Sequence, residues 1–164
     1  MSQSPTDPDP QAAQAAHALP IIGGALGFGA VSFAILAVVL PRSIGGGLAE
    51  GEAPDPDQVE FIRTLSMVHG AVLLGALAAA FALPAALGRR EGGEGNPVQG
   101  SLLRWAPLEG ASLFGTVIVL LAGLNDVVPA HPVYYANLLS LVVFGAVLLS
   151  DLFGGAGRPR DDRP

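Results

Sequence analysis

The sequence predicts an all-α, integral membrane four-helix bundle made of two transmembrane hairpins, and two observations lead to this fold. The chain has 164 residues, of which 51% are hydrophobic and 13% are charged, whereas a soluble domain carries about 25% charged residues. The apolar residues also fall into four blocks of 20 residues or more, and a helix needs about 20 residues to cross the hydrocarbon core. Four such helices in a chain of this length leave no polar faces to meet water.

The predicted spans cover residues 19–40, 62–87, 102–124 and 133–153. Residues 1–18 are rich in Pro, Asp, Gln and Ser, and we expect a disordered tail that becomes helical near Gln11. Asp57 and Glu60 ahead of the second span have the spacing of a capping box, which predicts a helix start with Asp57 as N-cap. Arg104 and Trp105 near the start of the third span are expected at the membrane interface, where Trp is favoured. Residues 154–164 form a second polar tail.

Composition excludes several kinds of site. The chain has no Cys, so it forms no disulfide and no thiolate metal site. His69 lies alone in the second span and is interpreted as a packing residue, because no second His lies near it; no metal or cofactor is predicted. The net charge is −6 and no basic patch is present, so nucleic acid is not an expected partner. No His/Asp/Glu cluster, nucleophile elbow or phosphate-binding loop is visible, so we do not expect an enzyme.

The arginines predict the orientation of the bundle. An even number of spans puts both termini on one side of the membrane. Six of the eight basic residues fall on that side and two, Arg42 and Arg63, on the other; the six are Arg89, Arg90, Arg104, Arg158, Arg160 and Arg163. The positive-inside rule then places both termini in the cytoplasm of a bacterium, with the four spans in its inner membrane.

Small residues recur along the spans and predict close helix packing. Gly23, Ala25, Gly27 and Gly29 alternate with larger residues in the first span. In lipid, such positions let helix backbones approach closely. A second interpretation is that the glycines leave room for a functional side chain of a neighbouring helix. The predicted packing positions are Gly23, Gly27, Gly29, Gly70, Gly75, Gly110 and Gly115. We expect the lipid bilayer as a partner, together with a second copy or another membrane protein.

Glu109 is the carboxylate inside the third span, and it is the candidate functional residue. A charged group within a span costs a few kcal/mol, so Glu109 is expected to face the bundle interior. Ser112 and Thr116 follow at three and seven residues, which puts all three on one helical face. One interpretation is a neutral Glu that fixes helix packing by a hydrogen bond. The other is a carboxylate that binds and releases a proton or cation, with Ser112 and Thr116 beside it.

The run LRWAPLEGASLFGTVIVLLAG resembles the third helix of a family of small, uncharacterised four-span bacterial membrane proteins. The matching positions are Arg104, Leu108, Glu109, Gly110, Ala111, Leu113 and Phe114. The order and length of the spans also agree, so the similarity covers most of residues 19–153. Such proteins are in turn distantly similar to the proteolipid rotor subunit c of ATP synthases, which implies H⁺ or Na⁺ binding by Glu109. Its place near the start of a third helix, just after Pro107, departs from the rotor pattern.

The favoured function is therefore structural, by helix–helix interaction in the membrane. Proton or cation translocation through Glu109 is the alternative.

Overall fold

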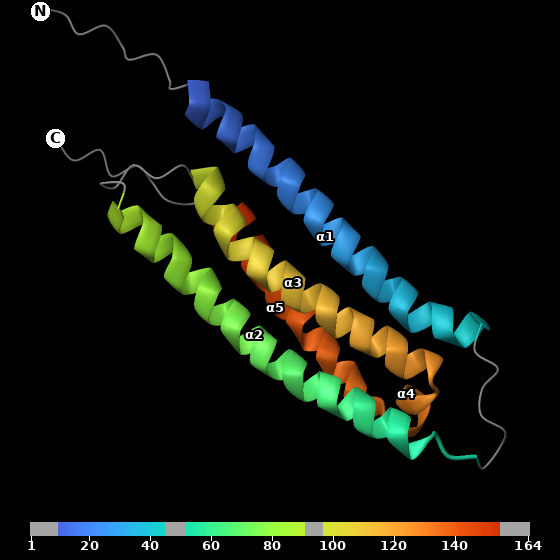
Figure 1. Ribbon diagram of the computed structural model, residues 1–164. Helices are drawn as coiled ribbons and strands as arrows, with labels where there is room; N and C mark the ends of the chain where they lie inside the picture. Colours follow the sequence, from blue (N-terminus) through green and yellow to red (C-terminus); the bar gives the residue numbers. More distant parts are fainter. Residues whose placement is uncertain (1–9, 45–51, 91–96, 155–164) are drawn as a thin grey trace, which may run out of the picture.

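The chain is an all-α four-helix bundle (Figure 1). The computed structural model describes residues 10–44, 52–90 and 97–154, and the side chains of 17–44, 52–86 and 98–154. No β-strand occurs in these described residues. The elements are α1 (Pro10–Ile44), α2 (Pro56–Arg90), α3 (Pro97–Leu124), α4 (Val127–Ala130), η1 (Pro132–Leu138) and α5 (Leu139–Gly154).

Four segments are long and apolar enough to cross a membrane, as the sequence predicts for a multi-pass membrane protein. They lie in α1, in α2, in α3 and in η1 with α5. The start of α1 and the end of α5 lie at the same end of the bundle (Figure 1). An even number of spans requires this arrangement.

The two predicted helix starts compare differently with the structure. Helix α1 begins at Pro10, one residue before Gln11, near which the tail is predicted to become helical. Helix α2 begins at Pro56, and its cap is Asp55: the Asp57 N–H donates to Asp55 Oδ1 at 2.9 Å. The prediction of Asp57 as the cap was wrong by two residues, because Pro56 has no N–H to satisfy and suits the first helical position.

The fourth span begins as a tight 3₁₀ segment, η1, which the sequence did not predict. Pro132 lacks an N–H, and the Tyr134 N–H donates to the His131 carbonyl three residues back. Polar side chains serve the carbonyls of this segment: Asn137 Nδ2 donates to Tyr134 O, and Ser140 Oγ donates to Asn137 O, each at 2.9 Å. Irregular backbone at membrane depth is tolerated where it is satisfied within the protein.

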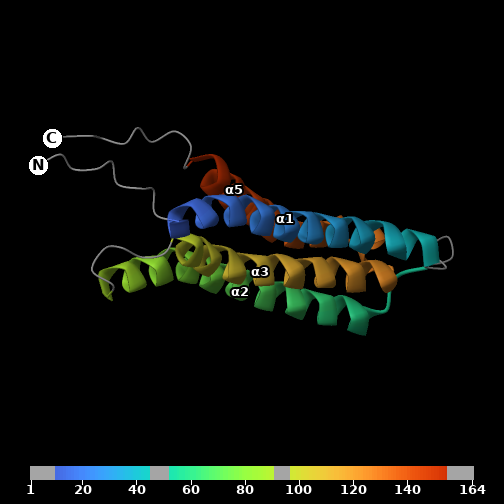
Figure 2. The ribbon, with the colours of Figure 1, turned by 90° about the horizontal axis from the view of Figure 1, so that it is seen from above.

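Helix α3 is the centre of the bundle. It packs against α1, α2 and α5, and it lies between α1 and α2 in both views (Figures 1 and 2). In the most apolar stretch of α3, 44% of the residues are buried, whereas the share is 17% to 22% in the other three spans. The antiparallel α1 and α2, consecutive in sequence, are therefore held together mainly through α3.

Within the described residues, the interior has two apolar clusters, one in each half of the bundle. The cluster nearer the chain termini contains Ala80, Trp105, Leu108, Phe144 and Leu148 among its buried members. The other cluster joins Ile62 of α2 to Ile118 and Ala122 of α3 and to Val127 and Val128 of α4. Large apolar side chains also cover the outside of the bundle, Phe28, Leu74 and Phe153 among them, where a bilayer would surround them.

Candidate functional site

Glu109 lies in α3, half-buried, one residue after the fully buried Leu108. Its carboxyl group forms no hydrogen bond or ion pair within the part of the chain whose side chains are described. Ser112 and Thr116 are fully buried, but Thr116 Oγ1 donates to the Ser112 carbonyl at 2.9 Å, and Ser112 Oγ has no partner. The predicted stripe of Glu109, Ser112 and Thr116 is thus present on the helix, without hydrogen bonds between its side chains.

A second polar group, which the sequence did not single out, lies deep between α2, α3 and η1. His69 is 3% exposed. Its Nδ1 lies 2.9 Å from Asn137 Oδ1, and its Nε2 lies 3.1 Å from the Ala111 carbonyl oxygen. Asn137 Nδ2 also donates to Ser66 Oγ at 3.0 Å, and Ser66 Oγ donates to the Ile62 carbonyl. We call this group the His69 network; it connects three elements by side chains.

Gly115 is what allows the His69 network to form. A Cβ on Gly115 would overlap the Asn137 carbonyl oxygen and would lie 2.8 Å from both Cε1 and Nε2 of His69. Real Cβ atoms do not approach other atoms this closely. The missing side chain therefore brings η1 against α3 and opens the α3 backbone to the imidazole.

One sequence signal could have located the His69 network. Ser66 and His69 in the second span, and Asn137 and Ser140 in the fourth, are polar pairs spaced three residues apart within apolar runs. Residues at this spacing share a helical face. Two polar faces in different spans predict a hydrogen-bonded contact between those spans.

A third polar group joins α3 to α5 near the end of the bundle where the chain terminates. Asp151 is the acceptor for both partners, Arg104 Nη1 at 2.6 Å and Trp105 Nε1 at 2.9 Å. The Arg104 guanidinium also lies 5.5 Å from the centre of the Phe81 ring. Trp105 is 1% exposed, and its indole N–H donates to the half-buried Asp151 carboxylate instead of to water.

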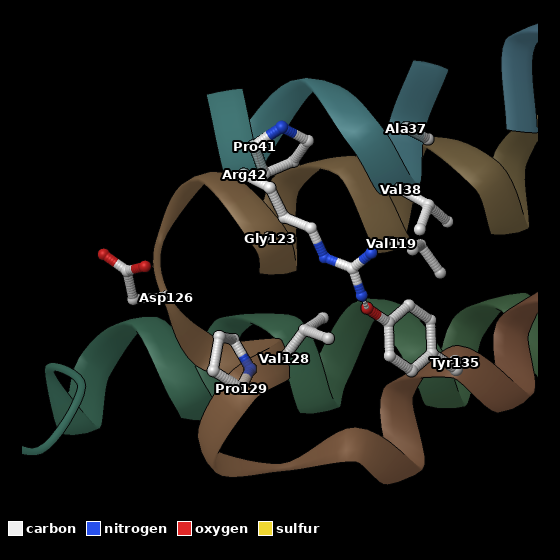
Figure 3. Close-up of a pocket in the computed structure, with 10 residues that line it drawn as sticks. All are labelled: Ala37, Val38, Pro41, Arg42, Val119, Gly123, Asp126, Val128, Pro129 and Tyr135. Carbon is white, nitrogen blue, oxygen red and sulfur yellow. Dashed lines mark hydrogen bonds between the residues drawn. The ribbon is translucent and has the colours of Figure 1, made fainter. Parts of the chain in front are cut away.

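A cavity lies at the opposite end of the bundle, between the end of α1 and the turn that holds α4 (Figure 3). Its volume is about 270 Å³. Arg42 reaches across it toward Tyr135, with Nη2 3.4 Å from the phenol oxygen, while Asp126 lies apart from this pair (Figure 3). The other lining residues are Ala37, Val38, Pro41, Val119, Gly123, Val128 and Pro129. One exposed guanidinium above apolar walls is the pattern of an interfacial arginine.

The predicted packing glycines divide into two groups. Gly23, Gly27 and Gly115 lie against other helices: a Cβ on Gly23 or Gly27 would be 3.1 or 3.0 Å from Leu148 of α5. At the other four positions an added Cβ would meet nothing within 4 Å; these are Gly29, Gly70, Gly75 and Gly110. Those four glycines therefore have no packing role within a single copy.

The chemistry available to this site is proton binding and hydrogen bonding. Among the residues whose side chains are described, no group of three or more His, Cys, Asp or Glu side chains could hold a metal ion. Among the ionisable groups, His69 lies in a hydrogen-bond network, Arg104 and Asp151 form an ion pair, and Glu109 has no partner among the described side chains.

Comparison with protein-family models, with curated proteins and with solved structures gave no match. The structure itself shows an all-α four-helix fold, with four helices among the described residues that could span a membrane.

Proposed function

We propose that the protein is a structural, helix–helix interaction protein of a bacterial inner membrane, and that it self-associates through the outer face of α2. The observation that carries the proposal is a row of small residues on that face. Ala71, Gly75, Ala78 and Ala82 are all exposed, at spacings of four, three and four residues, so they line one side of the helix. No charged residue occurs between Arg63 and Arg89 to oppose contact within lipid.

Small residues at this spacing favour association of helices in a bilayer. There, contact is driven by close backbone packing, because lipid chains are as apolar as the side chains. A second copy of α2 is the complementary surface, since a two-fold axis brings the same row against itself. Within one copy the row is exposed, an added Cβ on Gly75 would meet nothing within 4 Å, and only 17% of the most apolar stretch of α2 is buried.

Cross-linking tests this proposal directly, because the chain has no native Cys. Ala78→Cys in reconstituted membranes is expected to give a disulfide-linked dimer on mild oxidation. The matched control is Ala146→Cys, at a position on α5 that is also exposed, and this variant should remain monomeric. Adding Gly75→Ile should abolish the dimer, whereas Gly24→Ile, on an open face of α1, should leave it intact. Equal cross-linking at Ala78→Cys and Ala146→Cys would refute an interface on α2.

Proton or cation binding at Glu109 is the second candidate function. The observation that favours it is that a half-buried carboxylate within a span has no hydrogen-bond or ion-pair partner among the described side chains. The resemblance to rotor subunit c supports the same role. Carbodiimide labelling of Glu109 at several pH values, with and without Na⁺, tests this second candidate function. Labelling that Na⁺ suppresses supports an ion site; no labelling at any pH supports a sealed packing residue.

The proposed orientation has both termini in the cytoplasm. Arg104 lies near the bundle end where the chain begins and ends, and Arg42 and Arg63 lie near the other end, in support of the arginine count. Reporter fusions after Pro164 test it: a reporter active only in the periplasm would reverse the orientation.

A further inference from the structure

Both ring nitrogens of His69 face hydrogen-bond acceptors. Nδ1 lies 2.9 Å from Asn137 Oδ1, and Nε2 lies 3.1 Å from the Ala111 carbonyl oxygen. A neutral imidazole carries one N–H, on either nitrogen, whereas the protonated ring carries two. The arrangement of acceptors is therefore complementary to the protonated ring, and a neutral ring can satisfy only one of them.

The orientation of the Asn137 amide is determined by its other contacts. Its Nδ2 lies 2.9 Å from the Tyr134 carbonyl oxygen, which can only accept a hydrogen bond. Turning the amide over would set its oxygen against that carbonyl, so the Oδ1 atom is the one that faces His69. Asn137 cannot therefore donate to Nδ1 in place of accepting from it.

The second acceptor is available because of Gly115. The Ala111 carbonyl already serves the helix, but its oxygen has two lone pairs and can accept a further hydrogen bond. A side chain four residues later would normally cover this carbonyl. At Gly115 an added Cβ would lie 2.8 Å from His69 Nε2, so glycine leaves the approach open.

The groups that face the imidazole are neutral. Ser66 joins its network from α2, the Phe114 ring meets it edge-on from α3, and Asn137 meets it from η1. No carboxylate or guanidinium pairs with His69 in the described part of the chain. Glu109 is two residues before Ala111, and so about 160° away around α3. The protonated ring would thus be stabilised only by the dipoles of the Asn137 amide and the Ala111 carbonyl. Because no carboxylate pairs with the ring, the proton can also leave.

A groove leads to the ring from outside the bundle. It has a volume of about 350 Å³ and lies between α2 and the η1–α5 segment. His69 lies seven residues along α2 from Ile62, about 10 Å below the predicted membrane entry. The ionisable group that shares the groove is the Tyr134 phenol.

We propose that His69 is a reversible proton-binding site inside the membrane, in which the protonated ring donates at once to Asn137 Oδ1 and to the Ala111 carbonyl. With the proton bound, two hydrogen bonds connect α2 to both η1 and α3. When it leaves, one of the two hydrogen bonds is lost, and the junction between these elements loosens. This proposal does not depend on self-association through α2.

The test is ¹⁵N NMR of the histidine ring in the full chain, held in detergent micelles. The three histidines are His17, His69 and His131, and the first and last are exposed. His17→Gln with His131→Gln leaves His69 as the sole imidazole. At acidic pH, about pH 4 to 5, both ring nitrogens are expected to carry a proton; toward about pH 9, one of them should lose it reversibly. The Asn137 side-chain amide should shift along the same curve. A single N–H over the whole range would overturn the proposal.

Two companion proteins sharpen the result. A chain that keeps His131 alone supplies the titration of an exposed imidazole for reference. Asn137→Asp sets one carboxylate oxygen against Nδ1–H and loses the hydrogen bond to the Tyr134 carbonyl; in the folded variant the doubly protonated signal should persist to higher pH. If His69 merely fills space, Asn137→Asp leaves the ring signals unmoved, and that outcome also overturns the proposal. Circular dichroism of each variant establishes that the helices have formed.

Discussion

His69 and Glu109 are both ionisable side chains within apolar helices, but their surroundings differ in almost every respect. His69 is 3% exposed and has an acceptor at each ring nitrogen, contributed by two other elements. Glu109 is half-buried and has no hydrogen-bond or ion-pair partner among the described side chains. Glu109 attracts attention in the sequence because a charge in lipid is costly. The comparison teaches that hydrogen-bond partners on other helices, rather than the cost of a charge in lipid, decide which ionisable side chain belongs to the buried interior.

The glycines next to the two groups give the sharpest comparison, and the largest expected effect. Gly115→Ala should destabilise the bundle by about 3 kcal/mol or more, because the new Cβ overlaps the Asn137 carbonyl and crowds His69. Gly110→Ala, beside Glu109 on the same helix, meets open space and should change stability by at most about 1 kcal/mol, in the stabilising direction. Unfolding in mixed detergent titrated with SDS measures both. Equal loss at the two positions would remove the distinction between the two neighbourhoods.

Asn137 holds the His69 network together, so its removal should have the next largest effect. Asn137→Leu leaves the Tyr134 carbonyl and one imidazole nitrogen without partners, at a cost of about 1–3 kcal/mol. The same SDS titration applies. A stability equal to that of the parent chain would mean that η1 does not depend on these hydrogen bonds.

Two fully buried serines allow the His69 network to be compared with the Glu109 stripe, and the expected changes in stability are smaller. Ser140 Oγ donates to the Asn137 carbonyl, so Ser140→Ala should cost about 0.5–1.5 kcal/mol. Ser112 Oγ, on the Glu109 face of α3, has no partner. Ser112→Ala should therefore leave the thermal midpoint unchanged or raise it slightly. A larger loss of stability in Ser112→Ala than in Ser140→Ala would show that the Ser112 hydroxyl, and not the Ser140 hydroxyl, makes the stabilising contact.

The smallest expected effect is at Glu109 itself. Glu109→Gln should leave the folded fraction and the oligomer size unchanged, since a neutral Glu and a Gln are near-isosteric. Size-exclusion chromatography in detergent checks this. Loss of the folded protein would show that the charged form, or one specific hydrogen bond, stabilises the bundle, and would reverse the ranking of the two groups.

The four spans could be predicted because membrane thickness sets a length that local composition must meet. The helix ends were less certain: Pro56 moved the start of α2, and Pro132 tightened the start of the fourth span into η1. These are local effects, but they depend on which backbone groups find partners.

Local patterns indicate polar faces on the second and fourth spans, but they do not determine which side chains form hydrogen bonds with each other. His69 and Asn137 are 68 residues apart, and Arg104 and Asp151 are 47 apart. Their contact depends on the rotation of each helix about its own axis, which packing against α3 determines. The sequence singles out Gly23, Gly27, Gly75 and Gly115 alike as small positions, but it does not show that the first, second and fourth lie against other elements of the same copy while Gly75 is exposed.

The central position of α3 has a consequence for biosynthesis. Membrane insertion proceeds from the N-terminus, so α1 and α2 enter the bilayer while the helix that lies between them has yet to be synthesised. Two apolar helices with little direct contact to each other are then exposed to quality-control proteases. They are joined only when α3 is inserted. A chain cut after Arg90 should accordingly be degraded quickly, and co-production of the missing half should rescue it.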